Sequence, residues 1–428
     1  MMIRSQWETL PNGCRVVTAL MNHVESVSMG VWVGAGGRCE TKELSGASHF
    51  VEHLLFKGTK RRSAREISQT IEGRGGDINA FTQEESTCYY ARVATSQTWE
   101  AMDVLLDMML HSRFASVDIR KERDVVIEEI MMVRDQPHQQ VEEMLGELMW
   151  KNHALGRPIA GTVETVRKFT RETLLAYKDR YYTPSNMVLA FAGKVDHRAC
   201  VERVKKAFSV RGPILSRRFS PLGGEVAQHP FRALHKDIEQ THLALGFRGF
   251  GRHDPRRYAL KLLSVILGEN MSSRLFQVIR EQHGLAYSIQ CGGHLFDDTG
   301  AFVVTAGLDR DRLERALTLI VREIRKLKDK PVGKLEFNRA RDYSMGQIQL
   351  GFETTTSQMM WVGEHILSYG RVKSPEEGIQ ALQAVSFQDV QRLAEDLLCP
   401  ARCSLALVMP HVTEGLKKGL LKTVQQMS

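Results

Sequence analysis

The sequence lacks the features that would place it in several large classes of protein. No stretch of its 428 residues approaches about 18 uninterrupted apolar residues, so no membrane insertion is expected. The seven cysteines are spread along the chain without a C-x-x-C pair, which argues against a disulfide framework. G-x-S-x-G, P-loop and G-x-G-x-x-G patterns are also missing, which argues against serine hydrolases and nucleotide-binding enzymes of those types.

The charge balance gives little indication of a partner. The chain has 58 basic and 50 acidic side chains, and its net charge of +8 is scattered except for clusters at 57–65 and 322–330. No nucleic-acid reading motif accompanies these clusters, so nucleic-acid binding is not predicted. Residues 1–10 carry Arg4 and Glu8 where a secretory signal would need an apolar core, so secretion is not expected. We also see no mitochondrial-type presequence, which favours a bacterial cytoplasmic protein over a mitochondrial matrix protein.

The hydrophobic pattern repeats once over the length of the chain. Alternating segments predict strands at 27–33 and 187–192 in the first half, and strands in a similar order follow in the second half. Periodicity is lost in a stretch rich in proline and glycine. We therefore predict an α+β fold of two homologous αβ domains, each a mainly antiparallel sheet packed against helices. The predicted boundaries are a first domain at 1–211, a linker at 212–232 and a second domain at 233–428.

One segment carries the pattern H-x-x-E-H within a predicted helix at 46–56. At about 100° per residue, His49, Glu52 and His53 fall on one face of that helix, and the neighbouring apolar residues occupy the other. Two histidines four residues apart can bind one Zn²⁺. Glu52 is then placed to act as general base toward a water molecule. An ordinary solvated helix face would show the same residues, so the motif needs a third ligand.

Two glutamates further along the chain could complete such a site. Glu122 and Glu129 are seven residues apart and share one helix face, whereas Glu128 points about 100° away. A ligand and a supporting carboxylate could both come from that face. An ordinary acidic helix surface is the alternative.

Two further segments have patterns that invite a functional interpretation. Gly75 and Gly76 lead into an alternating strand at 77–82, which is typical of an edge strand that a peptide could extend, although an ordinary hairpin strand is the alternative. In the second half, Arg280 and Tyr287 lie seven residues apart in a segment that begins S-S-R-L-F. Alone, these two would be a surface arginine and a half-buried tyrosine.

Together these segments resemble the insulinase/pitrilysin family of zinc metallopeptidases. The match is to its half-length members, similar to the β subunit of mitochondrial processing peptidase and its bacterial relatives. The segment H-F-V-E-H-L-L-F-K-G-T at 49–59 resembles the metal-binding helix of the family. The interval from His53 to Glu129 also resembles the spacing that the family uses. The resemblance implies one Zn²⁺ per chain, bound by His49, His53 and Glu129, with Glu122 as the supporting glutamate.

The resemblance also implies roles outside the metal site. Residues 77–82 would bind substrate as an added strand, through Asn79, Ala80, Phe81 and Thr82. Arg280 and Tyr287 would contact the substrate backbone and the developing oxyanion. The second half contains no H-x-x-E-H and resembles the inactive copy of the duplicated domain.

The sequence thus predicts a zinc metalloendopeptidase that hydrolyses peptides or unfolded precursor segments. Half-length members need a second polypeptide to close a chamber, so we expect a homodimer or a heterodimer with a related subunit. Arg280 and Tyr287 would then serve the zinc site of the partner. The alternative is a non-catalytic assembly or peptide-binding subunit of the same fold. Such subunits commonly lack part of the set formed by His49, Glu52 and His53, which this chain retains.

Overall fold

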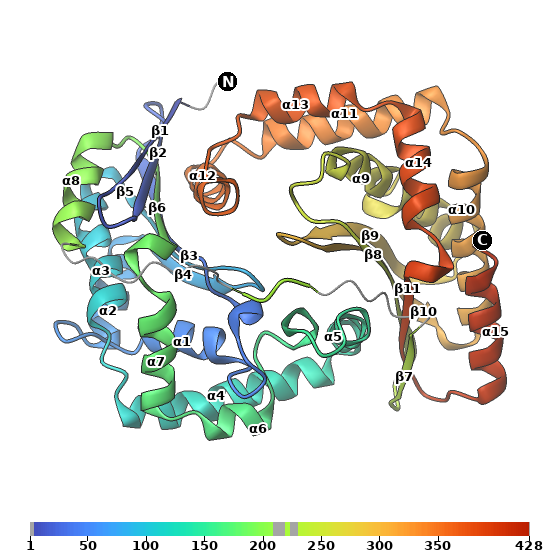
Figure 1. Cartoon of the computed structure of the whole chain (residues 1–428), viewed down its shortest axis with the longest axis horizontal. Helices are drawn as coiled ribbons and strands as arrows, with labels where there is room; N and C mark the ends of the chain where they lie inside the picture. The colour runs from blue at the N-terminus through green and yellow to red at the C-terminus, as the bar shows by residue number, and fades with distance from the viewer. Residues whose placement is uncertain (1–3, 209–218, 223–229, 428) are drawn as a thin grey trace. The chain divides into compact units, whose positions relative to one another are not determined.

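The computed structural model describes residues 4–208, 219–222 and 230–427, and these residues form two compact units (Figure 1). Unit 1 comprises Met1–Met131, Arg157–Ser220 and Gln349–Glu376. Unit 2 comprises Met132–Gly156, Pro221–Ile348 and Glu377–Ser428. Each unit therefore takes one segment from the opposite half of the chain, whereas the predicted domains 1–211 and 233–428 are each continuous in the sequence. Most of the predicted linker, 212–232, lies outside the described residues.

The sheet of unit 1 has the strand order β1-β2-β6-β3-β5-β4. Only the neighbours β2 and β6 run parallel in this sheet, and the other pairs are antiparallel. A turn with Gly13 at φ of 86° joins β1 to β2 as an antiparallel hairpin. The strand bounds are β1 Arg4–Thr9, β2 Arg15–Leu20, β3 Ser26–Val33, β4 Asp77–Thr82, β5 Thr87–Ala94 and β6 Met187–Gly193.

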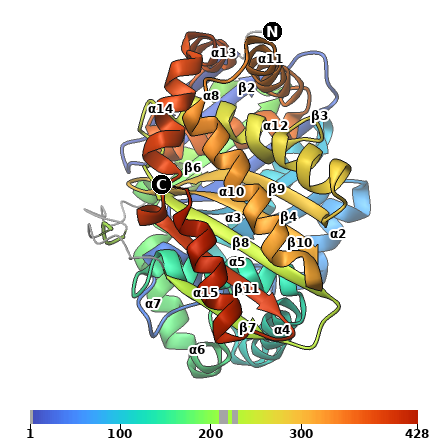
Figure 2. The same cartoon turned by 90° about the vertical axis from the view of Figure 1, so that its right-hand side faces the viewer.

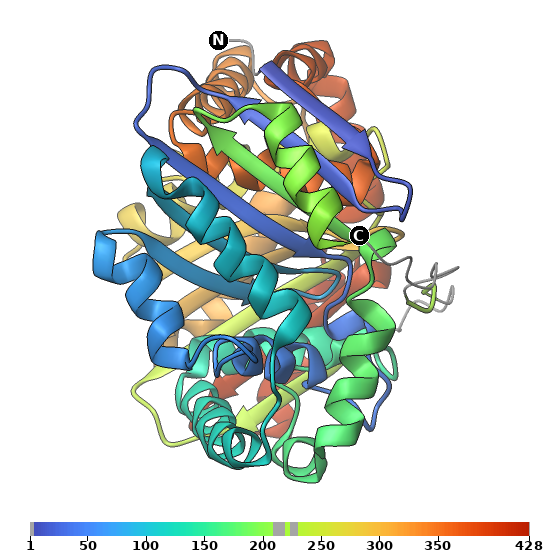
Figure 3. The ribbon, with the colours of Figure 1, turned by 90° about the vertical axis from the view of Figure 1, so that its left-hand side faces the viewer.

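Helices cover both faces of this sheet. Successive strand residues face opposite sides, so Val16 joins one hydrophobic core and Val17 joins the other. Figure 3 views the first face, where α3 contacts β3 and β5 and α8 contacts β2. Helix α12 covers the second face. The helices of unit 1 are α1 Ala47–Leu55, α2 Ala64–Ile71, α3 Thr98–His111, α4 Ser116–Asp135, α6 Val163–Lys168, α7 Arg171–Tyr181, α8 His197–Ala207 and α12 Thr355–Tyr369.

The sheet of unit 2 repeats this topology with the order β7-β11-β8-β10-β9. Strands β2-β6-β3-β5-β4 of unit 1 correspond one by one to β7-β11-β8-β10-β9 of unit 2. In each of these sets the strand that comes first in the sequence runs parallel to the one that comes last, which are β2 and β6 in unit 1 and β7 and β11 in unit 2. Strand β1 is an addition to unit 1. The bounds are β7 Phe231–His235, β8 Gln240–Gly249, β9 Ala286–Leu295, β10 Gly300–Asp309 and β11 Cys403–Met409.

The helices of unit 2 also pack on both faces of its sheet. Figure 2 shows α10, α14 and α15 on one face, and α5 packs on the other against β8 and β11. Short π-helical segments follow α9, at Val265–Glu269 and Phe276–Gln282. The α-helices are α5 Pro137–Met149, α9 Arg257–Ser264, α10 Leu313–Asp329, α11 Lys334–Leu350, α13 Pro375–Ala384, α14 Phe387–Leu397 and α15 Glu414–Gln425.

The two units exchange equivalent helices. Helix α12, from the second half of the sequence, packs on β2, β3 and β6 of unit 1, and α5, from the first half, packs on the corresponding strands β7, β8 and β11 of unit 2. The prediction of two αβ domains with mainly antiparallel sheets is thus confirmed. Within the described part of the chain, no helix is both long enough and apolar enough to span a bilayer.

Candidate metal centre

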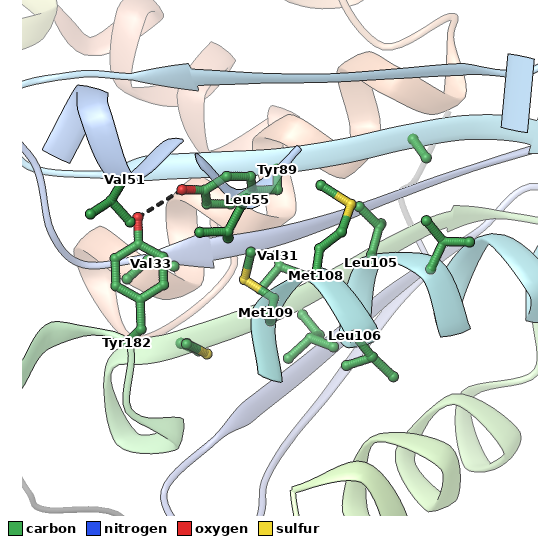
Figure 4. Close-up of a cluster of buried hydrophobic side chains, with 14 of the residues drawn as sticks. Val31, Val33, Val51, Leu55, Tyr89, Leu105, Leu106, Met108, Met109 and Tyr182 are labelled. Atoms are coloured by element: carbon green, nitrogen blue, oxygen red, sulfur yellow. Dashed lines mark hydrogen bonds between the residues drawn. The ribbon is translucent and has the colours of Figure 1, made fainter. Parts of the chain in front are cut away.

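Helix α1 has one face buried in the core of unit 1 and one polar face. Figure 4 shows Val51 and Leu55 packed near Tyr89 and Tyr182, whose hydroxyl groups are hydrogen-bonded to each other at 2.7 Å. Burying an aliphatic side chain of this size contributes about 1.5 to 3 kcal/mol, so this face fixes the helix on the sheet. The other face presents three partly exposed polar residues, His49, Glu52 and His53.

The first turn of α1 is held by the buried carboxylate of Glu40. Gly46 precedes the helix with φ of 95°, and a Cβ there would lie 2.6 Å from the carbonyl oxygen of Ala160. Glu40 accepts hydrogen bonds from the N–H groups of Gly46 and Ser48 at 2.8 and 2.7 Å, which satisfies donors that the helix leaves unpaired. Burial raises the pKa of Glu40 to about 7, although these hydrogen bonds oppose the shift.

Helix α4 places its two predicted glutamates on the side that faces α1. Glu122 is buried, and Glu129 is partly exposed beside both histidines of α1. Glu128 is exposed. The structure thus agrees with the helix-face argument that separates Glu129 from its neighbour.

Three donor groups converge between α1 and α4. The ligand atoms of His49, His53 and Glu129 all lie within 4.8 Å of one another. The carboxylate Oε2 of Glu129 is 3.7 Å from Nε2 of His49 and 3.5 Å from Nε2 of His53. Two bonds of about 2.05 Å at a tetrahedral angle separate their donor atoms by about 3.3 Å. The donor set therefore fits a single zinc ion in both its chemistry and its spacing.

The two histidines differ in their electrostatic surroundings. Burial and the neighbouring His53 lower the pKa of His49 to about 4, so that His49 is neutral at pH 7. Its Nδ1 is buried without a hydrogen-bond partner among the described residues. Burial alone would lower the pKa of His53, but the hydrogen bond to Glu122 and the charges of nearby carboxylates raise it above its usual value.

Glu122 supports His53 rather than joining the donor group. Its Oε2 lies 3.1 Å from Nδ1 of His53, and its Oε1 lies 2.8 Å from Nζ of Lys57. Burial alone would raise the pKa of Glu122, but these hydrogen bonds and the charges of Lys57 and His53 together lower it. A carboxylate on the second ring nitrogen fixes the tautomer and orientation of a metal-binding histidine. Lys57 was not singled out from the sequence, because its ion pair depends on the packing of α1 against α4.

Glu52 lies beside the donor group and receives a hydrogen bond from the β4 strand. The hydroxyl of Thr82 donates to Oε2 of Glu52. Burial and, to a smaller extent, the charge of Glu129 raise the pKa of Glu52. The hydrogen bond from Thr82 and the charge of His53 oppose this rise. A general base works best when its pKa approaches the working pH.

Strand β4, which ends at Thr82, is an edge strand of its sheet. Strand β4 pairs with β5 on one side and ends the sheet on the other, and it also contacts α1. Asn79 is exposed, and Ala80, Phe81 and Thr82 are partly exposed. The N–H and C=O groups on the outer side of such a strand can accept another strand.

Arg280 and Tyr287 lie together in unit 2. Tyr287, on β9, is 76% exposed. The guanidinium carbon of Arg280 is 5.8 Å from the centre of the Tyr287 ring and 4.9 Å from that of Phe276. The structure therefore brings these two residues together on one unit, whereas the donor group lies on the other.

Replacing Glu129 by glutamine should weaken metal binding by at least about tenfold, because an amide oxygen is a poorer ligand than a carboxylate. Glu128→Gln is the matched control, since it makes the same chemical change one residue away on an exposed part of α4. Zinc titration monitored by a competing chelator measures both affinities. Weaker zinc binding in Glu128→Gln than in Glu129→Gln would contradict the assignment.

Comparison with known proteins gives the same family over both halves of the chain. Residues 15–163 match the family model described as insulinase (peptidase family M16), and residues 168–343 match the one described as peptidase M16 inactive domain. A solved structure described as a protease from Helicobacter pylori superimposes with a TM-score of 0.87 at 20% identity. It covers 95% of this chain and 99% of its own, and so supports the fold.

Curated relatives are similar over nearly their whole length. An uncharacterized zinc protease of Mycobacterium tuberculosis (strain ATCC 25618 / H37Rv) is 39% identical over 98% of this chain and 95% of its own. An uncharacterized zinc protease of Bacillus subtilis (strain 168) is 38% identical over 94% of this chain and 97% of its own. With these identities and both family matches, the chain belongs to the insulinase family of metallopeptidases, as one of its half-length members.

Proposed function

We propose that the protein is a zinc-dependent endopeptidase that hydrolyses peptides or unfolded polypeptide segments. The observation that carries this proposal is the convergence of His49, His53 and Glu129 beside the carboxylate of Glu52. The names of the relatives support zinc as the metal. Because those relatives are bacterial, we also propose that the protein acts in the bacterial cytoplasm.

The residues of α1 and α4 divide the chemistry between them. His49, His53 and Glu129 would hold one Zn²⁺ per chain, which when bound acts as a Lewis acid toward a carbonyl group and acidifies water. Glu52 accepts the proton of the attacking water and delivers it to the leaving amine.

The substrate would bind as an extended segment along β4. Its backbone would pair with the outer side of 79–82, because none of the described strands pairs with that side. The contact between β4 and α1 brings this strand close to the donor group. Backbone pairing favours extended peptides over folded proteins, whose strands already have partners.

We further propose that Arg280 and Tyr287 complete the site in a dimer, with the pair from one protomer serving the zinc site of its partner. The hydroxyl of Tyr287 and the guanidinium of Arg280 are donors suited to a developing oxyanion. Their high exposure on unit 2 leaves them accessible to a second polypeptide. A homodimer meets this need, as does a heterodimer with a related subunit.

The metal requirement tests the proposed function. The purified protein should contain about one zinc per chain, and removal of the zinc by a chelator should abolish hydrolysis of unfolded peptides. Adding zinc back should restore it, because the ligands come from two helices whose positions are fixed by the core. Elemental analysis measures the zinc content, and a fluorescent peptide assay measures hydrolysis. Full hydrolysis by metal-free protein would refute the proposal, and zinc binding without hydrolysis would favour the non-catalytic alternative.

Mixing two inactive variants tests the composite site. Equal amounts of Glu52→Gln and Tyr287→Phe protomers, each nearly inactive alone, should form about half heterodimers on random exchange. Each heterodimer would have one intact site, so the mixture should recover about a quarter of the wild-type activity per chain. A mixture of exchanging protomers that stays inactive would show that the site is not shared in this way.

A further inference from the structure

The side chain of Thr82 lies between the edge strand and the general base. Thr82 is the last residue of β4, and its hydroxyl donates a hydrogen bond to Oε2 of Glu52 on α1. Backbone pairing of a peptide with β4 requires only the main chain of this strand. The hydroxyl of Thr82 is therefore available for a separate task.

The neighbouring hydroxyl group, that of Thr87, does not compete with Glu52 for the hydroxyl proton of Thr82. Thr87 lies opposite Thr82 in the hairpin, and the two hydroxyl oxygens are 3.5 Å apart, at the limit of a hydrogen bond. The Thr87 hydroxyl donates its proton to the carbonyl oxygen of Ala35 at 2.9 Å. A threonine hydroxyl has a single proton to donate. The proton of Thr82 is thus directed to Oε2, which leaves Oε1 of Glu52 for a water molecule.

The hairpin that carries Thr82 is anchored to the body of unit 1. A Cβ at Gly36 would lie 2.0 Å from the carbonyl oxygen of Gln83, so only glycine permits this approach of the two backbones. The guanidinium of Arg38 is fully buried and lies 2.6 Å from the carboxylate of Glu85 in the turn. The first contact explains why glycine stands at position 36, and together the two contacts fix the position of Thr82 at the base of the turn.

We infer that Thr82 is a positioning residue that orients the carboxylate of Glu52 for proton transfer. This inference rests on the proposed function, because it assigns a role to a side chain that acts through the general base. It adds to the role of 79–82 in binding substrate. A single strand would then both pair with the peptide backbone and hold the base that acts on it, so β4 links the alignment of the substrate to that of Glu52.

Two substitutions separate the hydroxyl from the bulk of the side chain. Thr82→Val keeps the shape of the side chain and removes the donor, so kcat for peptide hydrolysis should fall by about 10- to 100-fold, as expected when a reacting group is misplaced by about 1 Å. KM should change by less than about threefold and zinc content should stay the same, because neither the β4 backbone nor the ligands change. Thr82→Ser keeps the donor and should restore most of kcat.

A double-mutant cycle tests whether Thr82 acts through Glu52. In a Glu52→Gln background, Thr82→Val should cause little further loss of kcat, because the group that it orients is already disabled. Crystal structures of the zinc-free variants give a readout that does not depend on activity. The Glu52 carboxylate should keep its position in Thr82→Ser and leave it in Thr82→Val.

Three results would overturn the inference while leaving the proposed function intact, since zinc content and hydrolysis by the wild type are measured alongside. The first is an unchanged kcat in Thr82→Val. The second is an equal loss on Thr82→Val with and without Glu52, which would indicate an independent effect. The third is a loss in KM alone, which would make Thr82 a substrate-binding residue only.

Discussion

Glu52→Gln is expected to lower kcat for peptide hydrolysis by about 10²- to 10⁴-fold, which is the usual contribution of a positioned general base. The amide has nearly the shape of the carboxylate, and its oxygen can still accept the hydrogen bond from Thr82. It cannot take a proton from water at neutral pH. Zinc content should therefore remain at that of the wild type, and binding of a peptide should be unchanged.

The comparison of zinc content with rate distinguishes the base from the ligands. Steady-state hydrolysis and elemental analysis of the same preparation give both quantities, and peptide affinity follows from fluorescence anisotropy. Glu128→Gln again serves as the control, because its carboxylate is exposed on α4. Retention of more than about a tenth of the wild-type kcat in Glu52→Gln would exclude Glu52 as the principal base.

The polar face of α1 could be predicted because it depends on local periodicity alone. A helix at 46–56 places His49 and His53 on one face, and the structure has this helix at Ala47–Leu55. The same argument separates Glu129 from Glu128, and in the structure Glu129 lies beside both histidines whereas Glu128 is exposed. The choice of Glu129 as the third ligand needed the resemblance to a family, because an acidic helix surface has the same local pattern.

Glu122 is expected as a supporting residue from the family resemblance, but the contacts of Glu40 and Thr82 that also support the site could not be predicted, because they join distant segments. Helix-capping rules relate residues about three positions apart at the start of a helix. Glu40 lies further than that from the first turn of α1, whose N–H groups it accepts hydrogen bonds from. The hydrogen bond from Thr82 to Glu52 links residues 30 positions apart. A threonine in a strand gives no sign of which side chain will lie opposite its hydroxyl.

The helix α12 illustrates the same limit for the fold. The hydrophobic pattern of the sequence does not indicate a helix at Thr355–Tyr369, which contains Gly363 near its centre. A Cβ at Gly363 would lie 2.2 Å from Nε1 of Trp32, so the glycine allows α12 to approach β3 closely. Glycine lowers the helix propensity of a segment by about 1 kcal/mol. The tertiary contact with the sheet of unit 1 thus outweighs the local preference.

His53→Ala should have the largest effect on the metal. Its Nε2 is one of three donors in the group, and its Nδ1 is hydrogen-bonded to Glu122. The substitution removes both contacts, and Glu122 keeps its ion pair with Lys57. Loss of an outer partner of a ligand costs about 10- to 100-fold in metal affinity, so loss of the ligand itself should cost at least about 100-fold. Hydrolysis should fall with the zinc content.

Thermal unfolding measures this loss without reference to activity. Zinc at about 100 times its dissociation constant stabilises the folded state by about 2.7 kcal/mol, which corresponds to a rise in Tm of about 5 to 10 °C for a unit of this size. The wild type and His23→Ala, which changes an exposed histidine of unit 1, should both show this rise after metal removal and readdition. His53→Ala should show little or none, because two donors hold the ion too weakly at that concentration. An equal rise in Tm for His53→Ala would mean that zinc binds elsewhere on the chain, and the donor set would have to be reassigned.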